Sequence, residues 1–139
     1  MRLLTQNNRW SCVLYSVAMC INRDPSELIT HLGHDGSEIL YPDLQDPYCR
    51  RAFAIEEFAT YLYNHSFCLM PFVRGGNCNG KDIYFRCDPP LHMVGVLTYG
   101  RHAVAWDGHE VFDPIGLVRK LDYSWDVFWM IVLLKQTRL

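Results

Sequence analysis

The sequence of 139 residues has no long apolar run and no surplus of basic residues. Its longest apolar stretch, VFWMIVLL near the C-terminal end, is far shorter than the roughly 20 residues that span a bilayer as a helix. The 13 Lys and Arg residues are mixed along the chain with 15 Asp and Glu residues, so no basic stripe is present for a nucleic acid or an anionic membrane. We therefore expect no nucleic-acid partner and no membrane partner.

The first ten residues, MRLLTQNNRW, lack the apolar segment of a secretory signal. This absence favours a soluble, cytoplasmic protein, in which the default state of the six cysteines is the reduced thiol. If Cys12 and Cys20 lie on one helix, they are about 12 Å apart along its axis, too far for a disulfide.

The chain also lacks a Cys-x-x-Cys pair and a phosphate-binding loop. The residues that could be imagined as zinc ligands follow no zinc-site spacing: Cys68, Cys78, Cys87 and His92. The stretch GGNCNG is not followed by the lysine of a phosphate-binding motif. We expect no metal and no organic cofactor.

No repeat, low-complexity tract or linker divides the chain, and half of its residues are hydrophobic. We therefore expect a single domain over residues 1–139 with one sizeable core.

Helical signals occupy the first half of this domain. Apolar spacing predicts a helix from Cys12 to about Ile21, with Ser11 placed to cap it. Asp24, Pro25, Glu27 and Gly33 carry the start and stop signals of a second helix, including a capping-box-like spacing at Glu27. A third helix is predicted over 54–66, after a loop rich in Asp, Pro and Gly at 34–51.

Strand signals occupy the second half. The predicted strands are 67–73, 93–99, 102–106, 109–114 and 128–135, with a loop at 74–82. The last of these is apolar enough to be central and covered on both faces. Helices followed by an antiparallel sheet predict an α+β fold.

The Asp107-Gly108 pair is the strongest hairpin signal in the chain. A two-residue turn there places Trp106 opposite His109 and His102 opposite Asp113. Directly opposed residues share a face with Cβ atoms about 5 Å apart, so the carboxylate could hold one imidazole nitrogen and leave the other for a nucleophile. A register slip of one residue would place His102 and Asp113 on opposite faces. The alternative without a functional role is that each residue merely lies at the end of a strand.

Cys12 is placed at the start of the first predicted helix. Unpaired N–H groups and the positive end of the helix dipole stabilise a thiolate at such a position. Gln6, in the preceding loop, could donate its side-chain amide to the oxyanion of a tetrahedral intermediate. Taken singly, Cys12 is better explained as a buried residue at a helix start and Gln6 as a solvated loop amide, and it is their combination with His102 and Asp113 that favours a nucleophile.

The combination of QNNRWSC near the start and GRHAVAWDGHEVFDPIG late in the chain resembles the papain-like cysteine peptidases, and within them the C39-like family. The resemblance implies a papain-like α+β fold in which N-terminal helices pack on a C-terminal antiparallel sheet. It implies Cys12 as nucleophile, His102 as general base and acid, Asp113 as the residue that orients His102, and Gln6 in the oxyanion hole. It implies no cofactor.

The function that follows is that of a cysteine hydrolase cleaving a peptide or isopeptide bond in a protein or peptide substrate. Two alternatives stay open. The scaffold could be catalytically idle and bind and inhibit a protein partner, such as a host protein, because small members of this family occur in phages and mobile elements. The same residues could also serve an acyltransferase or a deamidase. Substrate preference and oligomeric state are not indicated by these residues.

Overall fold

A computed structural model describes residues 1–73, 76–78, 81–83, 89–122 and 125–134, and within them it shows an α+β arrangement of helices and an antiparallel sheet. The helices are α1 (Cys12–Ile21), α2 (Pro25–Leu32) and α3 (Ala59–Asn64), the last preceded by the 3-10 turn η1 (Ile55–Phe58). The strands are β1 (Phe67–Val73), β2 (Gly76–Cys78), β3 (Lys81–Ile83), β4 (Gly95–Tyr99), β5 (His102–Trp106), β6 (Val111–Asp113), β7 (Leu117–Arg119) and β8 (Val127–Leu133).

The first two helices have the boundaries that their local signals predict. The Oδ1 atom of Asp24 accepts a hydrogen bond from the Ser26 N–H at the start of α2, and Gly33 ends that helix with a left-handed φ of 78°. The predicted capping role of Glu27 is wrong, because its carboxylate bonds the Tyr61 hydroxyl of α3 instead. Ser11 stands at the start of α1 but makes no side-chain capping bond.

The third predicted helix begins as a tighter turn than expected. Residues 55–58 form η1, and only 59–64 are α-helical. The Glu57 carboxylate accepts a hydrogen bond at 2.8 Å from the backbone N–H of Ala54, which fastens this first turn. The predicted regular helix over 54–66 is therefore shorter than expected and is preceded by a 3-10 turn.

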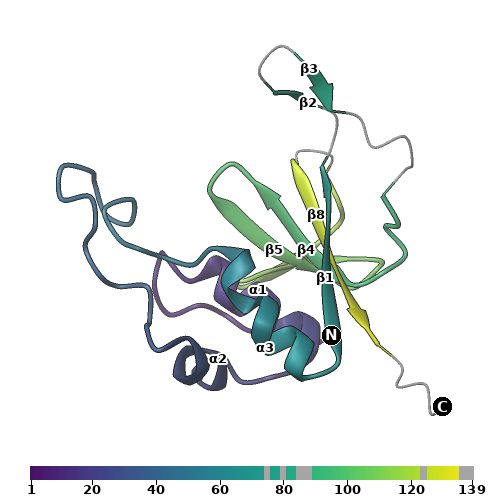
Figure 1. Cartoon of the computed structure of the whole chain (residues 1–139), viewed down its shortest axis with the longest axis horizontal. Helices are drawn as coiled ribbons and strands as arrows, with labels where there is room; N and C mark the ends of the chain where they lie inside the picture. The colour runs from purple at the N-terminus through teal and green to yellow at the C-terminus, as the bar shows by residue number, and fades with distance from the viewer. Residues whose placement is uncertain (74–75, 79–80, 84–88, 123–124, 135–139) are drawn as a thin grey trace.

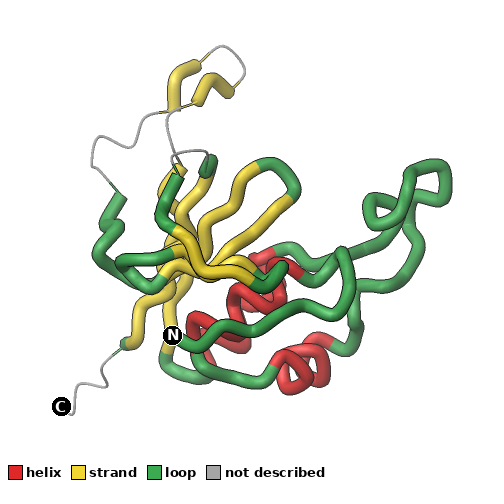
Figure 2. Tube along the Cα trace, turned by 180° about the vertical axis from the view of Figure 1, so that it is seen from behind, coloured by secondary structure: helices red, strands yellow, loops and turns green. Residues whose placement is uncertain are grey.

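Six strands form one antiparallel sheet in the order β1-β8-β4-β5-β6-β7. The helices lie on one side of it, with α1 against β4 and β5 and α3 against β1 (Figure 1). Seen from behind, the helices remain grouped together, and a long loop extends beyond them (Figure 2). The core between α1 and the sheet thus holds the start of α1 beside β5.

The prediction of a central, doubly covered C-terminal strand is confirmed. β8 lies between β1 and β4. On the helix side, Ile131 and Trp129 belong to the same apolar cluster as α1 and α3. On the other side, Phe128 and Met130 pack in a second cluster that includes Trp125.

The loop predicted at 74–82 is wrong where the structure describes it, because β2 and β3 pair there as a small separate sheet. The remainder of that segment lies outside the described residues. β7 is an element that the sequence pattern did not predict; its three residues pair with β6 at the edge of the large sheet.

Within the described residues, no helix is both long enough and apolar enough to cross a membrane. Cys12, Cys20, Cys49 and Cys68 are free thiols, so the prediction that Cys12 and Cys20 do not bridge is confirmed.

Candidate active site

The β5–β6 hairpin has a longer loop than the two-residue turn predicted from Asp107-Gly108. The observed pairs are Trp106 with Val111 and Ala105 with Phe112, so the register is shifted by two residues. The cause is the Asp107 carboxylate, whose Oδ1 accepts hydrogen bonds from two backbone N–H groups of the loop at 2.8 and 2.6 Å. Because side chains alternate with a period of two, this even shift keeps His102 and Asp113 on one face.

His102 and Asp113 are joined despite the shift. The Nε2 atom of His102 lies 2.8 Å from Oδ1 of Asp113, which now stands diagonally across the hairpin. The Asp113 side chain is 4% exposed, and its Oδ1 also accepts the backbone N–H of Ile115 at 3.1 Å. Asp113 is therefore a fixed, buried acceptor for one nitrogen of the imidazole.

Cys12 meets the other side of the imidazole. Packing of α1 on β5 brings the first residue of the helix to the first residue of the strand. A hydrogen bond with the Cys12 side chain is the main reason that the pKa of His102 is raised above its ordinary value; the charge and hydrogen bond of Asp113 act in the same direction, and burial opposes them. Since Nε2 is engaged by Asp113, Nδ1 is the nitrogen left for the thiol.

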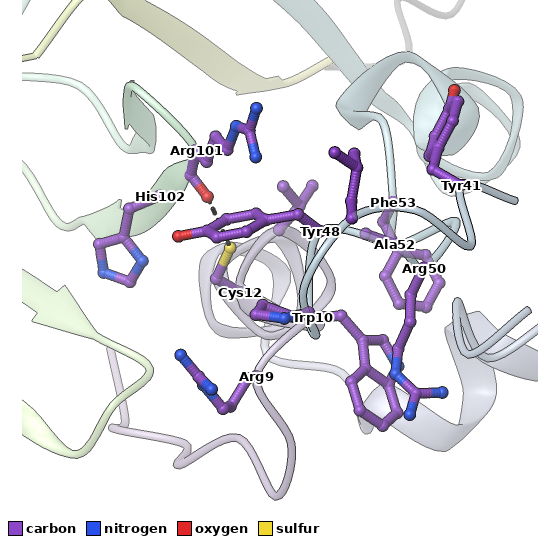
Figure 3. A pocket seen from close by; sticks show the side chains of 13 residues that line it. Arg9, Trp10, Cys12, Tyr41, Tyr48, Arg50, Ala52, Phe53, Arg101 and His102 are labelled. Carbon is purple, nitrogen blue, oxygen red and sulfur yellow. Dashed lines mark hydrogen bonds between the residues drawn. The ribbon is translucent and has the colours of Figure 1, made fainter. Parts of the chain in front are cut away.

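The main-chain carbonyl of Arg101 completes the surroundings of the thiol, 3.9 Å from Sγ of Cys12 (Figure 3). The residue before His102 thus contacts the sulfur directly. The Cys12 side chain is nearly buried but opens onto a cavity.

Gln6 is tied to the chain that follows Asp113. Its backbone N–H donates to the carbonyl oxygen of Pro114 at 2.7 Å. Its side-chain Nε2 donates to the carbonyl oxygen of Asn8 at 2.7 Å, while Oε1 is buried without a hydrogen-bond partner among the described residues. One of the two hydrogens on Nε2 is thereby used within the loop.

A cavity of about 670 Å³ opens beside Cys12 and His102. One wall comes from the loop 34–51, through Tyr41, Leu44 and Tyr48. Figure 3 shows the Tyr48 ring reaching from this loop toward the catalytic candidates. The volume falls within the range of roughly 300–1,000 Å³ typical of ligand pockets.

Side-chain stacking fastens this loop to both halves of the site. The guanidinium of Arg50 lies 4.3 Å from the ring centre of Trp10, and that of Arg101 lies 4.3 Å from the ring centre of Tyr48. Trp10 also donates its indole N–H to the Asp35 carbonyl at 3.1 Å. The segment interpreted from its composition as a plain loop is therefore part of the site.

Two further residues support the His102–Asp113 pair and were missed by sequence reasoning. Arg119 places Nη2 3.7 Å from Oδ2 of Asp113 and also bonds the Tyr99 hydroxyl. Tyr99 is paired with His102 across the β4–β5 turn, with the ring centres 5.4 Å apart edge to face. The short Gly100-Arg101 connection between two apolar runs was a usable signal for Tyr99, whereas Arg119 lies on the unpredicted β7.

The structure describes only some of the cysteines that could be imagined as zinc ligands. Cys87 and the side chain of Cys78 lie outside the described residues, and no group of three potential ligands occurs among the side chains that are described.

Comparisons with protein-family models, with curated proteins and with solved structures found no match to this chain. The functional argument therefore depends on the geometry of the site.

Proposed function

We propose that this chain is a papain-like cysteine hydrolase of the C39-like type that cleaves a peptide or isopeptide bond. The observation that carries the proposal is that His102, bonded to Asp113, interacts with Cys12, and that Cys12 and His102 line one cavity. These residues come from three separate elements, the start of α1, the start of β5 and the end of β6. The order nucleophile, base and orienting carboxylate is what a thiol hydrolase needs.

In this mechanism, Nδ1 of His102 takes the proton of Cys12 and the sulfur attacks the substrate carbonyl carbon. The C–N bond then breaks, and the leaving amine takes the proton from His102. Water, deprotonated by His102, attacks the resulting thioester, releases the carboxylic acid and restores the thiol. Over one turnover the amine leaves with the proton that came from Cys12, and the restored thiol takes its proton from the water, by way of His102 in both steps.

The oxyanion formed in both attacks requires donors. The backbone N–H of Cys12 belongs to the first turn of α1, where N–H groups have no acceptor within the helix. Gln6 supplies the second donor in this proposal, through the Nε2 hydrogen that does not bond Asn8. Its backbone bond to Pro114 supports this role because it anchors Gln6 next to the Asp113 segment.

The test is the pH dependence of iodoacetamide alkylation at Cys12, followed by peptide mass spectrometry and compared with His102→Ala. A free thiol has a pKa of about 8.5. A thiol paired with an imidazole should react rapidly well below that pH, and His102→Ala should lose this fast reaction. Cys68 is the internal control for a half-buried thiol. Cys20 should remain unreactive, because burial raises its pKa to about 12. Alkylation of Cys12 that is no faster than alkylation of Cys68 would refute the proposal that the chain is an enzyme.

Cys12→Ala separates hydrolysis from the other functions that this geometry permits. The variant should abolish cleavage of the substrate. A variant that keeps the full biological effect would instead identify an idle scaffold that binds a protein partner. The products of the wild-type protein separate the remaining reactions. Transfer of the acyl group to an amine would identify an acyltransferase, and conversion of a side-chain amide to an acid would identify a deamidase.

A further inference from the structure

The cavity beside Cys12 carries positive charge without matching negative charge. Among the described residues, its lining includes Arg9, Arg50 and Arg101 but no Asp or Glu. Arg50 is already neutralised, because its Nε and Nη2 atoms bond both carboxylate oxygens of Asp46 at 2.8 and 3.1 Å. The charges available to a ligand are therefore those of the other two arginines.

Arg9 and Arg101 are both exposed, and neither forms an ion pair with the residues that the structure describes. Arg9 is near enough to Asp46 to lower the pKa of that carboxyl, although less than the bond from Arg50 does. Figure 3 shows Arg9 and Arg101 on opposite sides of Cys12, with the guanidinium of Arg101 extending away from the sulfur. A group bound at Cys12 would thus have a cation on either flank.

The rest of the cavity is apolar and aromatic. Trp10, Val13 and Phe53 form its inner part, and Tyr41 and Leu44 of the loop 34–51 are 57% and 48% exposed at its rim. Bulky apolar side chains in water at the mouth of a cavity are suited to cover a substrate side chain. The lining therefore combines an apolar surface with two arginines, Arg9 and Arg101, that form no ion pair among the described residues.

From this combination we infer the substrate class: a peptide with a carboxylate, from an acidic side chain or a free C-terminus, beside a bulky apolar residue near the scissile bond. The inference rests on the proposed function, because it takes Cys12 as the attacking group. Arg101 is the principal contact. Its guanidinium is held in place by the Tyr48 ring, and its backbone carbonyl contacts the Cys12 sulfur. Arg101 thus contacts the thiol through its backbone, while the position of its charged side chain is set by the Tyr48 ring.

The test uses three chloroacetyl dipeptides that differ only in charge: chloroacetyl-Leu-Glu-amide, chloroacetyl-Leu-Gln-amide and chloroacetyl-Leu-Gln with a free carboxylate. In each, the Cys12 sulfur forms a bond to the CH₂ carbon and chloride leaves. We expect one or both anionic probes to alkylate Cys12 about three- to ten-fold faster than the neutral probe, as two exposed charge pairs would allow. The faster anionic probe identifies the side chain or the terminus as the source of the carboxylate.

The ratio of anionic to neutral rates should fall to nearly one in Arg9→Gln/Arg101→Gln. Arg101→Lys, which keeps the charge without the planar group, should retain most of the preference. Arg2→Gln removes an exposed arginine that does not line this cavity and should leave the ratio unchanged.

The outcomes separate the two proposals. Equal rates for all three probes at a fast-reacting Cys12, or a preference that survives the double substitution, would overturn the substrate class and leave the hydrolase intact. Slow reaction of all three probes, no faster at Cys12 than at Cys68, would overturn both.

Discussion

Two histidine–carboxylate pairs of the same length lie among the residues that the structure describes, and one of them is beside the thiol of Cys12. His102 contacts Asp113 with 2.8 Å between Nε2 and the carboxylate oxygen, and His34 contacts Glu57 at the same distance. Each carboxylate also has an arginine at 3.7 Å, Arg119 beside Asp113 and Arg51 beside Glu57. A search for such pairs alone would have found two candidate sites.

The difference lies at the second imidazole nitrogen. Nδ1 of His34 accepts the backbone N–H of Gly36 at 3.0 Å, and its ring stacks on Phe53 with 5.0 Å between ring centres. Both ring nitrogens are thus used to fasten the start of the loop 34–51. The second nitrogen of His102 faces Cys12 instead. A carboxylate orients an imidazole in both places, and the third partner distinguishes the structural pair from the pair that the proposed hydrolase would use.

The same substitution at the two histidines gives the largest expected contrast. His102→Ala should lower substrate turnover by roughly 10²–10⁴-fold, the range lost with a general base. It should also reduce the free energy of unfolding, because the buried Asp113 carboxylate loses its imidazole partner. His34→Ala should leave turnover within about two-fold but reduce the free energy of unfolding by about 1–3 kcal/mol, because Glu57 and the Gly36 N–H lose a partly buried partner. Steady-state kinetics and urea unfolding of both variants check this. A large loss of turnover in His34→Ala would break the distinction between the pairs.

Replacing each carboxylate by its amide probes the same contrast more gently. Asp113→Asn should lower turnover roughly 10- to 150-fold, corresponding to the about 1.5–3 kcal/mol of a hydrogen bond to a charged group. The pKa of His102 should fall, because Asp113 is one of the groups that raise it. Glu57→Gln should leave turnover within about two-fold, since it alters the structural pair only. Equal losses of turnover in the two variants would contradict these assignments.

The pH dependence of stability follows from the direction of the His102 shift. A raised pKa in the folded state means that the protonated imidazole is favoured by folding, so this stabilisation is fully present below about pH 6.5, the ordinary value, and is lost as the pH rises through the raised pKa. The difference in unfolding free energy between wild type and Asp113→Asn should therefore be larger at pH 5.5 than at pH 8. Urea unfolding at both values measures it, and a difference that grows with pH would contradict the shift.

Local signals in the sequence were sufficient for the elements that carry Cys12 and for the shared face of His102 and Asp113. Apolar spacing and the Asp24 and Gly33 caps depend on neighbouring residues only, so α1 and α2 could be predicted directly. The hairpin register was wrong by two residues, yet the pair survived because a strand repeats its faces every second residue. The prediction of which face each residue lies on was therefore reliable, whereas the prediction of the turn type was not.

Contacts between distant side chains were beyond prediction. The loop 34–51 becomes a cavity wall because Arg50 stacks on Trp10 and Arg101 stacks on Tyr48. No periodic pattern in the sequence predicts these pairs. The hydrogen bond between the Tyr61 hydroxyl and the Glu27 carboxylate, found in place of the predicted capping bond, is another such contact, since the two residues are 34 positions apart. β7 has only three residues at a sheet edge, too short for alternation to be recognised, and so Arg119 could not be placed.

Arg119 offers the smallest and most specific test of the comparison. It lies beside Asp113 and is itself bonded to Asp122 at 2.8 Å, so part of its charge is already compensated. Removing it with Arg119→Gln takes a cation away from the His102–Asp113 pair, and the pKa of His102 should rise further. Turnover should change by less than about three-fold, because a partly exposed and partly compensated ion pair contributes about 0–1 kcal/mol.

The measurement for Arg119→Gln is the NMR titration of the imidazole protons, in which His34 serves as a reference within the same molecule. The His102 resonances should shift their titration to higher pH while those of His34 stay unchanged. Arg51→Gln, the matched change beside Glu57, should do the reverse and perturb His34 alone. If removing either arginine moved both histidines, the two pairs would be electrostatically coupled across the molecule, and assigning one to catalysis and the other to structure would fail. If Arg119→Gln lowered the His102 titration instead, Arg119 would have to act by holding Asp113 in place, since loss of its charge alone can only raise the pKa.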